Sequence, residues 1–85
     1  MLELYQFESC PFCAQVRETL DELGLDYIIR TVSPSRRERP RVEAISGQTM
    51  VPVLVDPERK TVLAESRDII AYLRRHYGAG RAVGD

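Results

Sequence analysis

The chain has 85 residues, of which 44% are hydrophobic and 29% charged, and its formal net charge is -1. This length suffices for one domain with one core, and the balanced charge excludes the electrostatic attraction of a strongly basic protein to nucleic acid or anionic lipid. No apolar run is long enough to cross a bilayer, and residues 1–8 lack the basic start and apolar centre of a signal peptide. We therefore expect a cytoplasmic protein that binds neither nucleic acid nor membranes.

The first third of the chain has the pattern of a strand, a helix and a second strand. Residues 2–7 form a short, mostly apolar run, which is typical of a buried strand. From 11 to 23, apolar side chains recur on one helical face, with Pro11 suited to the first helical position and Gly24 to the stop. Residues 26–32 are rich in β-branched and aromatic residues, which favours a strand. A unit of this kind predicts two parallel strands.

The start of the next helix has two interpretations. Ser35 and Glu38 have the spacing of a capping box, which would begin the helix at residue 36. Pro40 would then remove an internal hydrogen bond, so the alternative is a helix that begins near Pro40. In both interpretations the helix ends by Gly47.

The second half of the chain predicts an antiparallel hairpin and a last helix. Residues 53–55 and 61–64 are two short β-rich runs joined by a polar loop. Ser66 is a suitable cap for a helix that runs to about Tyr77. Residues 78–85 have little to bury and are expected to form a flexible tail.

Both cysteines lie in the run Ser9-Cys10-Pro11-Phe12-Cys13, between the first strand and the first helix. The thiolate is the nucleophile in disulfide exchange, and a cysteine just before a helix faces unpaired N–H groups. The helix dipole contributes only about 0.3–1 kcal/mol at an exposed site, so direct hydrogen bonds to the sulfur must add to it. Cys13, one turn into the helix, is expected to be more buried and able to attack a mixed disulfide formed at Cys10. Cys10 is the predicted nucleophile and Cys13 the resolving thiol.

Other interpretations of these residues stay open. Two cysteines at this spacing are half of a zinc site, but a closed structural site needs four ligands, and the only histidine, His76, lies far away in the sequence at a helix end. Inert packing cysteines would not need a helix N-terminus. Pro52 is allowed at the first residue of a strand without any function. Its functional interpretation is a cis Val51–Pro52 bond beside the cysteines, which leaves the backbone of Val51 free to pair with a bound peptide.

Three features together resemble the glutaredoxins: Cys10-Pro11-Phe12-Cys13 after an opening strand, Val51-Pro52 before a hairpin, and the order βαβ-α-ββ-α. The run from Glu65 to Leu73 (Glu-Ser-Arg-Asp-Ile-Ile-Ala-Tyr-Leu) is also similar to the amino-terminal domain of glutathione transferases. The resemblance implies an α/β domain at residues 1–77 with a thioredoxin-like fold, in which helices flank a four-stranded mixed sheet.

The resemblance also implies a dithiol, glutathione-dependent thiol–disulfide oxidoreductase with Cys10 and Cys13 as its catalytic pair. Glutathione is the implied co-substrate, with no tightly bound cofactor and no metal. The implied partners are glutathione or another small thiol and disulfide-containing proteins, and we expect a monomer. Val51 would hold the cysteinyl backbone of glutathione. The predicted glutathione-binding residues are Pro11, Phe12, Val51, Pro52, Glu65 and Ser66.

Several of these residues have simpler interpretations. The hydroxyl and N–H of Ser66 suit the γ-glutamyl carboxylate, but Ser66 could also be a plain helix cap. Glu65 could pair with the glutamyl amine or be a surface residue. One arginine of a basic cluster could meet the glycyl carboxylate, although a solvated basic face is the stronger interpretation. The cluster consists of Arg36, Arg37, Arg39 and Arg41.

The chain also departs from the family pattern. Many glutaredoxins have a lysine shortly before the first cysteine, whereas this chain has Glu8, which would oppose a thiolate by about 1 kcal/mol if solvated at roughly 4 Å. Glu65-Ser66 replaces the glycine pair of glutaredoxins, which leaves the thiol partner open. No helical second domain follows Tyr77, so we do not expect glutathione conjugation. The alternatives are a glutathione-dependent iron–sulfur cluster carrier, which Pro11 disfavours, and a non-catalytic transferase-like binding domain.

Overall fold

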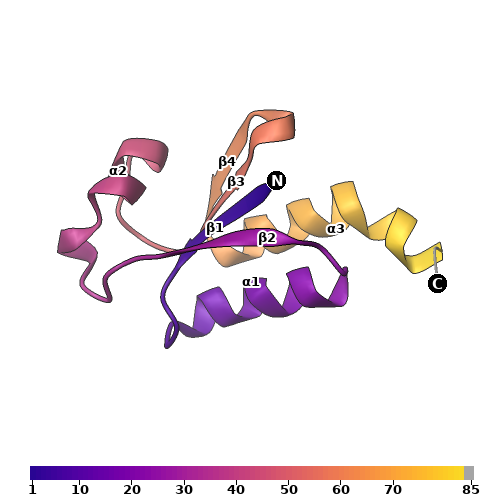
Figure 1. The fold of residues 1–85 in the computed structure, drawn as a ribbon, viewed down its shortest axis with the longest axis horizontal. Helices are drawn as coiled ribbons and strands as arrows, with labels where there is room; N and C mark the ends of the chain where they lie inside the picture. Colours follow the sequence, from indigo (N-terminus) through magenta and orange to yellow (C-terminus); the bar gives the residue numbers. More distant parts are fainter. Residues whose placement is uncertain (84–85) are drawn as a thin grey trace.

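A computed structural model describes the backbone of residues 1–83 and the side chains of residues 1–78. One mixed sheet has the strand order β2-β1-β3-β4 (Figure 1). β2 runs parallel to β1, while β3 is antiparallel to both β1 and β4. The predicted βαβ unit and hairpin are therefore confirmed. The strands are β1 (Leu2–Gln6), β2 (Tyr27–Thr31), β3 (Val53–Asp56) and β4 (Thr61–Ala64).

Two helices pack together on one face of the sheet. α1 (Pro11–Glu22) connects the parallel strands, and α3 (Ser66–Val83) lies beside it (Figure 1). Because successive strand side chains point to opposite faces, alternate residues of β1 and β3 meet these helices. Each fully buried leucine stabilises the fold by about 1.5–3 kcal/mol relative to an exposed one. The core between sheet and helices contains Leu2, Leu4, Val16, Leu20, Leu23, Leu54, Ile69 and Leu73.

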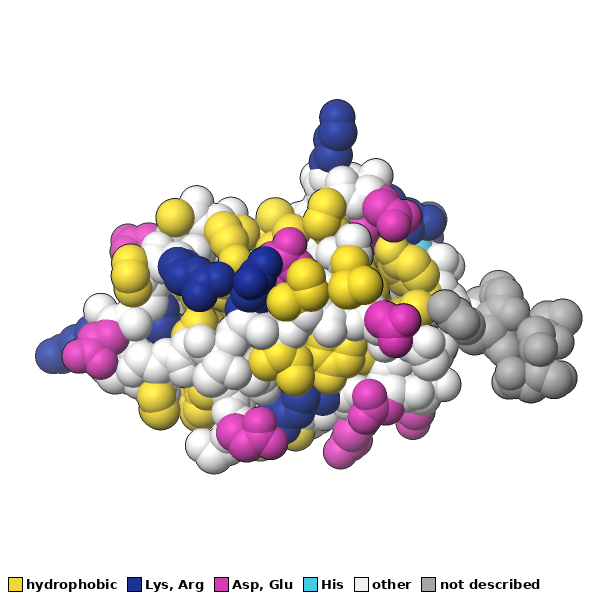
Figure 2. Space-filling model, viewed as in Figure 1, with side chains coloured by type: hydrophobic (Ala, Val, Ile, Leu, Met, Phe, Trp, Pro, Cys, Tyr) yellow, Lys and Arg dark blue, Asp and Glu magenta, His cyan; other side chains and the backbone are white. Residues whose placement is uncertain are grey.

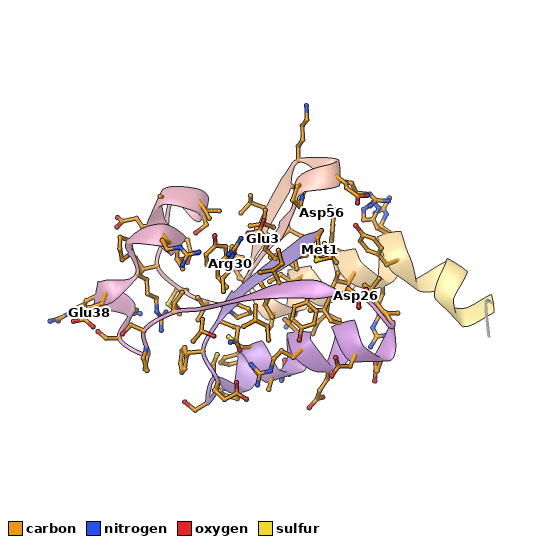
Figure 3. The ribbon with its side chains drawn as sticks, in the orientation of Figure 1. Met1, Glu3, Asp26, Arg30, Glu38 and Asp56 are labelled. Atoms are coloured by element: carbon orange, nitrogen blue, oxygen red, sulfur yellow. The ribbon has the colours of Figure 1, made fainter. Side chains whose placement is uncertain are left out.

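The short helix α2 (Pro40–Ser46) covers one end of the opposite face of the sheet. Its Val42 is fully buried and packs with Tyr5 of β1 and Val53 of β3. The rest of this face carries mixed side chains: Figure 2 shows apolar groups interrupted by acidic and basic ones. Glu3 of β1 and Arg30 of β2 point toward one another there (Figure 3), and Arg30 Nε donates to Glu3 Oε1 at 3.1 Å.

Both predicted starts of the middle helix correspond to real elements. A short 3₁₀ turn, η1 (Arg36–Glu38), precedes α2, which begins at Pro40 because a first helical residue needs no N–H partner. The capping box is wrong: the side chain of Ser35 makes no capping bond to this turn. Instead, Ser33 Oγ donates to Glu38 Oε1 at 3.2 Å.

The last helix is longer than predicted. It does not end near Tyr77 but continues to Val83, so residues 78–83 of the expected tail are helical, while 84–85 lie outside the described residues. A physical reason is packing: Gly78 lies against Leu23 at the end of α1, and a methyl group at Gly78 would touch Leu23 Cδ2 at 4.0 Å. Glycine costs a helix roughly 0.5–1 kcal/mol, which helix–helix packing offsets. No helix in the described part of the chain is long and apolar enough to span a membrane.

Candidate functional site

The N-terminus of α1 is built around the sulfur of Cys10. Cys10 has extended backbone angles (φ -76°, ψ 117°) and is the capping residue, while Pro11 takes the first helical position. Its Sγ accepts a hydrogen bond from the backbone N–H of Cys13 at 3.3 Å. A side-chain acceptor at this position satisfies one of the four N–H groups that a helix start leaves unpaired. The direct hydrogen bond that the sequence required at Cys10 is therefore present.

The two cysteines differ in environment. The two residues come within 3.0 Å of each other, and both are free thiols. The exposed fraction of Cys10 is 5%, whereas Cys13 is fully buried. Burial, followed by the hydrogen bond with Cys10, raises the pKa of Cys13 to about 12; a backbone hydrogen bond from Phe7 and the charge of Arg17 act in the opposite direction. The Cys13 thiol therefore stays protonated beside Cys10 and can donate a hydrogen bond to Cys10 Sγ.

A cavity of about 410 Å³ opens beside this helix start. It lies between α1, the segment before β3, and the start of α3. Five of the six predicted glutathione-binding residues line it; Pro11 does not and is exposed, and neither cysteine lines it. The Val51–Pro52 peptide bond is cis. The residues that line the cavity are Phe12, Gln48, Met50, Val51, Pro52, Ala64, Glu65 and Ser66.

Glu65 and Ser66 form the wall of the cavity at the start of α3. Glu65 has φ 75°, a left-handed conformation that costs a residue with a side chain of order 1–3 kcal/mol. Its carbonyl accepts from Ile69 N–H at 3.0 Å, so Glu65 takes the position before the helix. Ser66 is the first helical residue rather than the predicted cap, which leaves its N–H among the unpaired groups at a helix N-terminus.

Gln48 and Met50 were not predicted from the sequence, although both line the cavity. The side chain of Gln48 holds the backbone of Met50 from both sides: its Oε1 accepts from Met50 N–H at 2.8 Å, and its Nε2 donates to Met50 O at 3.1 Å. Nε2 also donates to Ser46 Oγ at 2.8 Å. Gln48 thereby fixes the segment that leads to Val51.

The four arginines of the basic cluster have different surroundings. The expectation of a solvated face is wrong for Arg39, which is 6% exposed because it donates to three backbone carbonyls, those of Ser33, Pro34 and Thr49. Arg41 lies over the ring of Tyr5, whereas the exposed Arg36 donates to the sulfur of Met50 at 3.4 Å. Arg36 is thereby in contact with a residue that lines the cavity.

A cation that sequence reasoning missed stands near the thiols. No lysine precedes Cys10, but Arg17 lies four residues, or one helical turn, after Cys13, and its charge lowers the pKa of Cys13. The signal was present in this spacing, because residues four apart share a helix face.

His76 is exposed and lies in the interior of α3, because the helix continues to Val83. Its ring contacts that of Tyr72 in a tilted arrangement, with centroids 4.5 Å apart and an interplanar angle of 51°. Within the residues that the structure describes, no three His, Cys, Asp or Glu side chains are grouped so that they could hold a metal ion.

Curated relatives match most of the chain. The family described as "Glutathione S-transferase, N-terminal domain" matches residues 4–81. Prostaglandin E synthase 2 of Mus musculus is 37% identical over 84 residues, which cover 96% of this chain and 21% of the mouse protein. An uncharacterized glutaredoxin-like 8.6 kDa protein in the rubredoxin operon of Clostridium pasteurianum is 30% identical over 54 residues, which cover 64% of this chain and 72% of that protein.

Solved structures share the fold. A glutathione transferase homolog from Drosophila mojavensis with bound glutathione has a TM-score of 0.82 and 30% identity, over 92% of this chain and 36% of that one. Glutaredoxin 2 from Salmonella typhimurium in complex with glutathione has a TM-score of 0.75 and 26% identity, over 86% of this chain and 32% of that one. The chain belongs to the glutathione S-transferase N-terminal domain family and has the thioredoxin-like fold that this family shares with glutaredoxins.

Proposed function

We propose that this chain is a dithiol thiol–disulfide oxidoreductase that uses glutathione and reduces protein disulfides or protein–glutathione mixed disulfides. The observation that carries the proposal is the hydrogen bond from Cys13 N–H to Cys10 Sγ at a helix start. Phe12, between the two cysteines, lines a cavity that is also lined by the cis-bonded Val51 and Pro52. The fold and the glutathione bound in two structural neighbours support the glutathione-related part of this function.

The chemistry needs two thiols with different roles. The Cys10 thiolate attacks one sulfur of a disulfide, a Cys10–S–S–R bond forms, and the other sulfur leaves as a thiolate that takes up a proton. Cys13 then loses its proton and attacks Cys10 Sγ, which forms the Cys10–Cys13 disulfide and releases the second thiol. Two glutathione molecules reduce this disulfide by the reverse steps and leave as glutathione disulfide. The buried, protonated Cys13 suits the second role, because it waits until a mixed disulfide exists at Cys10.

We propose an orientation of glutathione in the cavity from the chemistry of the residues that line it. The backbone of Val51 pairs with the cysteinyl residue, and the N–H and hydroxyl of Ser66 receive the γ-glutamyl carboxylate, which a helix N-terminus favours. Glu65 pairs with the glutamyl amine. Arg36, which contacts Met50 at the cavity, is the arginine of the cluster that we assign to the glycyl carboxylate.

The test is the intact mass of three proteins after incubation with glutathione disulfide. Cys13→Ser should gain one glutathione, because the mixed disulfide at Cys10 can form but cannot be resolved. Cys10→Ser, the matched control, should gain none. The unaltered chain should pass to an internal disulfide and release reduced glutathione.

The outcomes separate the parts of the proposal. An adduct on Cys10→Ser but none on Cys13→Ser would reverse the roles of the two cysteines, and equal yields on both variants would refute the assignment of Cys10 as the sole nucleophile. No adduct on Cys13→Ser, although Cys10 reacts with iodoacetamide, would keep a reactive thiol but exclude glutathione disulfide as its partner. A Cys10 that reacts with neither reagent would refute the enzyme and leave a binding domain.

A further inference from the structure

Arg17 is held in a fixed position next to the thiol pair. It is half-buried on α1, one turn beyond Cys13. Its Nη1 donates to Gln6 Oε1, and its Nη2 donates to the backbone carbonyl of Glu8 at 3.2 Å. Gln6 is 1% exposed and is itself anchored by a 3.1 Å hydrogen bond from its Nε2 to Thr31 Oγ1. The guanidinium therefore bridges α1, β1 and the loop that leads to Cys10.

The same loop reaches Cys13. The backbone of Phe7 makes a hydrogen bond that favours the charged form of the Cys13 thiol, and Phe7 O accepts from Cys10 N–H at 3.2 Å. Arg17, bonded to the carbonyl of Glu8, secures the residue next to Phe7. Arg17 thus acts on Cys13 in two ways: directly through its charge, and indirectly through the loop that carries Phe7.

Few charged groups besides Arg17 act on the thiol of Cys13. The ionisable groups that act on Cys13 are Cys10 and Arg17. From β2, Tyr27 faces the same region, and Glu8 and Asp21 are the acidic groups that act on it together with Arg17. α3 contributes apolar side chains, among them Ile69 and Leu73, to the core beside α1.

We propose that Arg17 is the positioning residue for the resolving step, in which it favours the thiolate of Cys13 after Cys10 has formed a mixed disulfide. This inference rests on the proposed function and adds a role for one residue in its second half-reaction. In the resting dithiol, both the hydrogen bond and the charge of Cys10 oppose ionisation of Cys13. When Cys10 Sγ is bonded to glutathione sulfur, it carries no charge, so these two causes weaken. Burial then still raises the pKa of Cys13, while the Phe7 hydrogen bond and the charge of Arg17 still lower it.

The size of the effect follows from two opposing trends. Each unit by which the pKa of Cys13 rises lowers its thiolate fraction at neutral pH about tenfold. A thiolate of higher pKa is the stronger nucleophile, with a Brønsted coefficient of about 0.4–0.5, so each unit also makes the thiolate about threefold more reactive. The net loss of rate is therefore about threefold for each unit. Loss of a nearby opposite charge raises a pKa by about one to three units, and the low end applies here because the charge of Arg17 is the smallest of the causes that act on Cys13. Arg17→Gln should therefore slow resolution about threefold.

The experiment follows both half-reactions in one time course. Each reduced protein is mixed with glutathione disulfide and quenched in acid at intervals, and intact mass then reports the mixed disulfide and the internal disulfide. The variants are Arg17→Gln, Arg17→Lys, which keeps the charge, and Arg74→Gln. Arg74 is the matched control because it also pairs with α1, through Glu22 at 3.0 Å, but far from the thiols.

We expect Arg17→Gln to accumulate the mixed disulfide while its first step changes less than its second. Its deficit should stay constant while the buried Cys13 thiol is protonated and shrink above about pH 9, as this thiol ionises. Arg17→Lys should resolve within about twofold of the unaltered chain, and Arg74→Gln should behave as the unaltered chain. A deficit that does not shrink at alkaline pH, or equal loss in both steps, would assign Arg17 a structural role only and overturn the inference.

Two further results are decisive. If Arg17→Gln does not fold, as judged by circular dichroism, the comparison of Arg17→Lys with the unaltered chain decides: resolution slowed more than about threefold would overturn the proposal, and a smaller change would support it. If the unaltered chain forms neither the mixed disulfide nor the internal disulfide, the proposed function itself has failed. Normal resolution in a folded Arg17→Gln would refute the role of Arg17 alone.

Discussion

Arg39 offers the sharpest test of how this fold is held together. Its guanidinium donates to Ser33 O and Thr49 O at 2.8 Å and to Pro34 O at 3.1 Å, and it lies over the ring of Phe7 at 5.2 Å. These contacts tie the segments before and after α2 to each other and to the loop before Cys10. Arg39→Ala removes all of them at once.

The magnitude can be worked from these contacts. A hydrogen bond from a charged donor contributes about 1.5–3 kcal/mol, so three such bonds set an upper range of roughly 4.5–9 kcal/mol. Water recovers part of this, because Pro34 is exposed and Ser33 and Thr49 are half-buried. We expect Arg39→Ala to lower the free energy of unfolding by about 3–5 kcal/mol, a large share of the roughly 5–15 kcal/mol of a typical domain. Arg39→Lys should cost about 2 kcal/mol, because one ammonium cannot reproduce the planar fork of an arginine.

Thermal unfolding followed by circular dichroism measures this loss. A change of 1 kcal/mol moves the Tm of a domain of this size by roughly 4–8 °C, so Arg39→Lys should lower it by about 8–16 °C. Arg37→Ala, in the exposed neighbour on η1, is the matched control and should change the free energy of unfolding by less than about 0.5 kcal/mol. A loss below about 1 kcal/mol for Arg39→Ala would refute this account of the buried arginine.

Three further predictions concern pH and ligand binding. Burial alone would raise the pKa of Asp56, but hydrogen bonds from Tyr77 and Tyr72 hold it below its usual value. The stability that Asp56 contributes is therefore present above its pKa in the unfolded chain, about 3.9, and is lost as the pH falls through its lower pKa in the folded chain. Acid unfolding of Asp56→Asn should consequently depend less on pH below about pH 4. Burial and then the bond to Asp56 raise the pKa of Tyr77 to about 12. The stability that Tyr77 contributes to the fold should be lost as the pH rises from about 10 toward that pKa. An alkaline unfolding transition of Tyr77→Phe as steep as that of the unaltered chain would contradict this role of Tyr77. Ser66→Ala should weaken glutathione binding about fivefold by calorimetry, and unchanged affinity would remove Ser66 from the site.

The regular elements were predictable because their signals are local. The apolar face of α1 and the β-rich runs of β2, β3 and β4 follow periods that a short window contains. Pro11 at the start of α1 adds its own local reason. With short connections and the right-handed crossover rule, such elements leave few possible arrangements, and the four-stranded mixed sheet was predicted correctly.

The contacts of Arg39 and Arg17 were not predictable in the same way. Arg39 stands in a polar, charged run, and it becomes buried because carbonyls ten residues further on, at Thr49, and six residues before, at Ser33, converge on it. Arg17 meets Gln6 across eleven residues. Neither partner has a sequence pattern, since any residue supplies a backbone carbonyl. Polar contacts of this kind become visible only when the loops are placed.

The two family resemblances correspond to the two sides of one cavity. Phe12 of the Cys-Pro-Phe-Cys helix lines one side, and Glu65 and Ser66, the part similar to transferases, line the other, with Val51 between them. Under the proposed function, the transferase-like side binds the γ-glutamyl end and Val51 aligns the cysteinyl residue, so the thiol of glutathione is directed to the start of α1. Under the same proposal, a cysteine at this helix start attacks the disulfide that is bound there, and Cys10, with Cys13 one turn into α1, is the group that gives the site disulfide exchange as its chemistry.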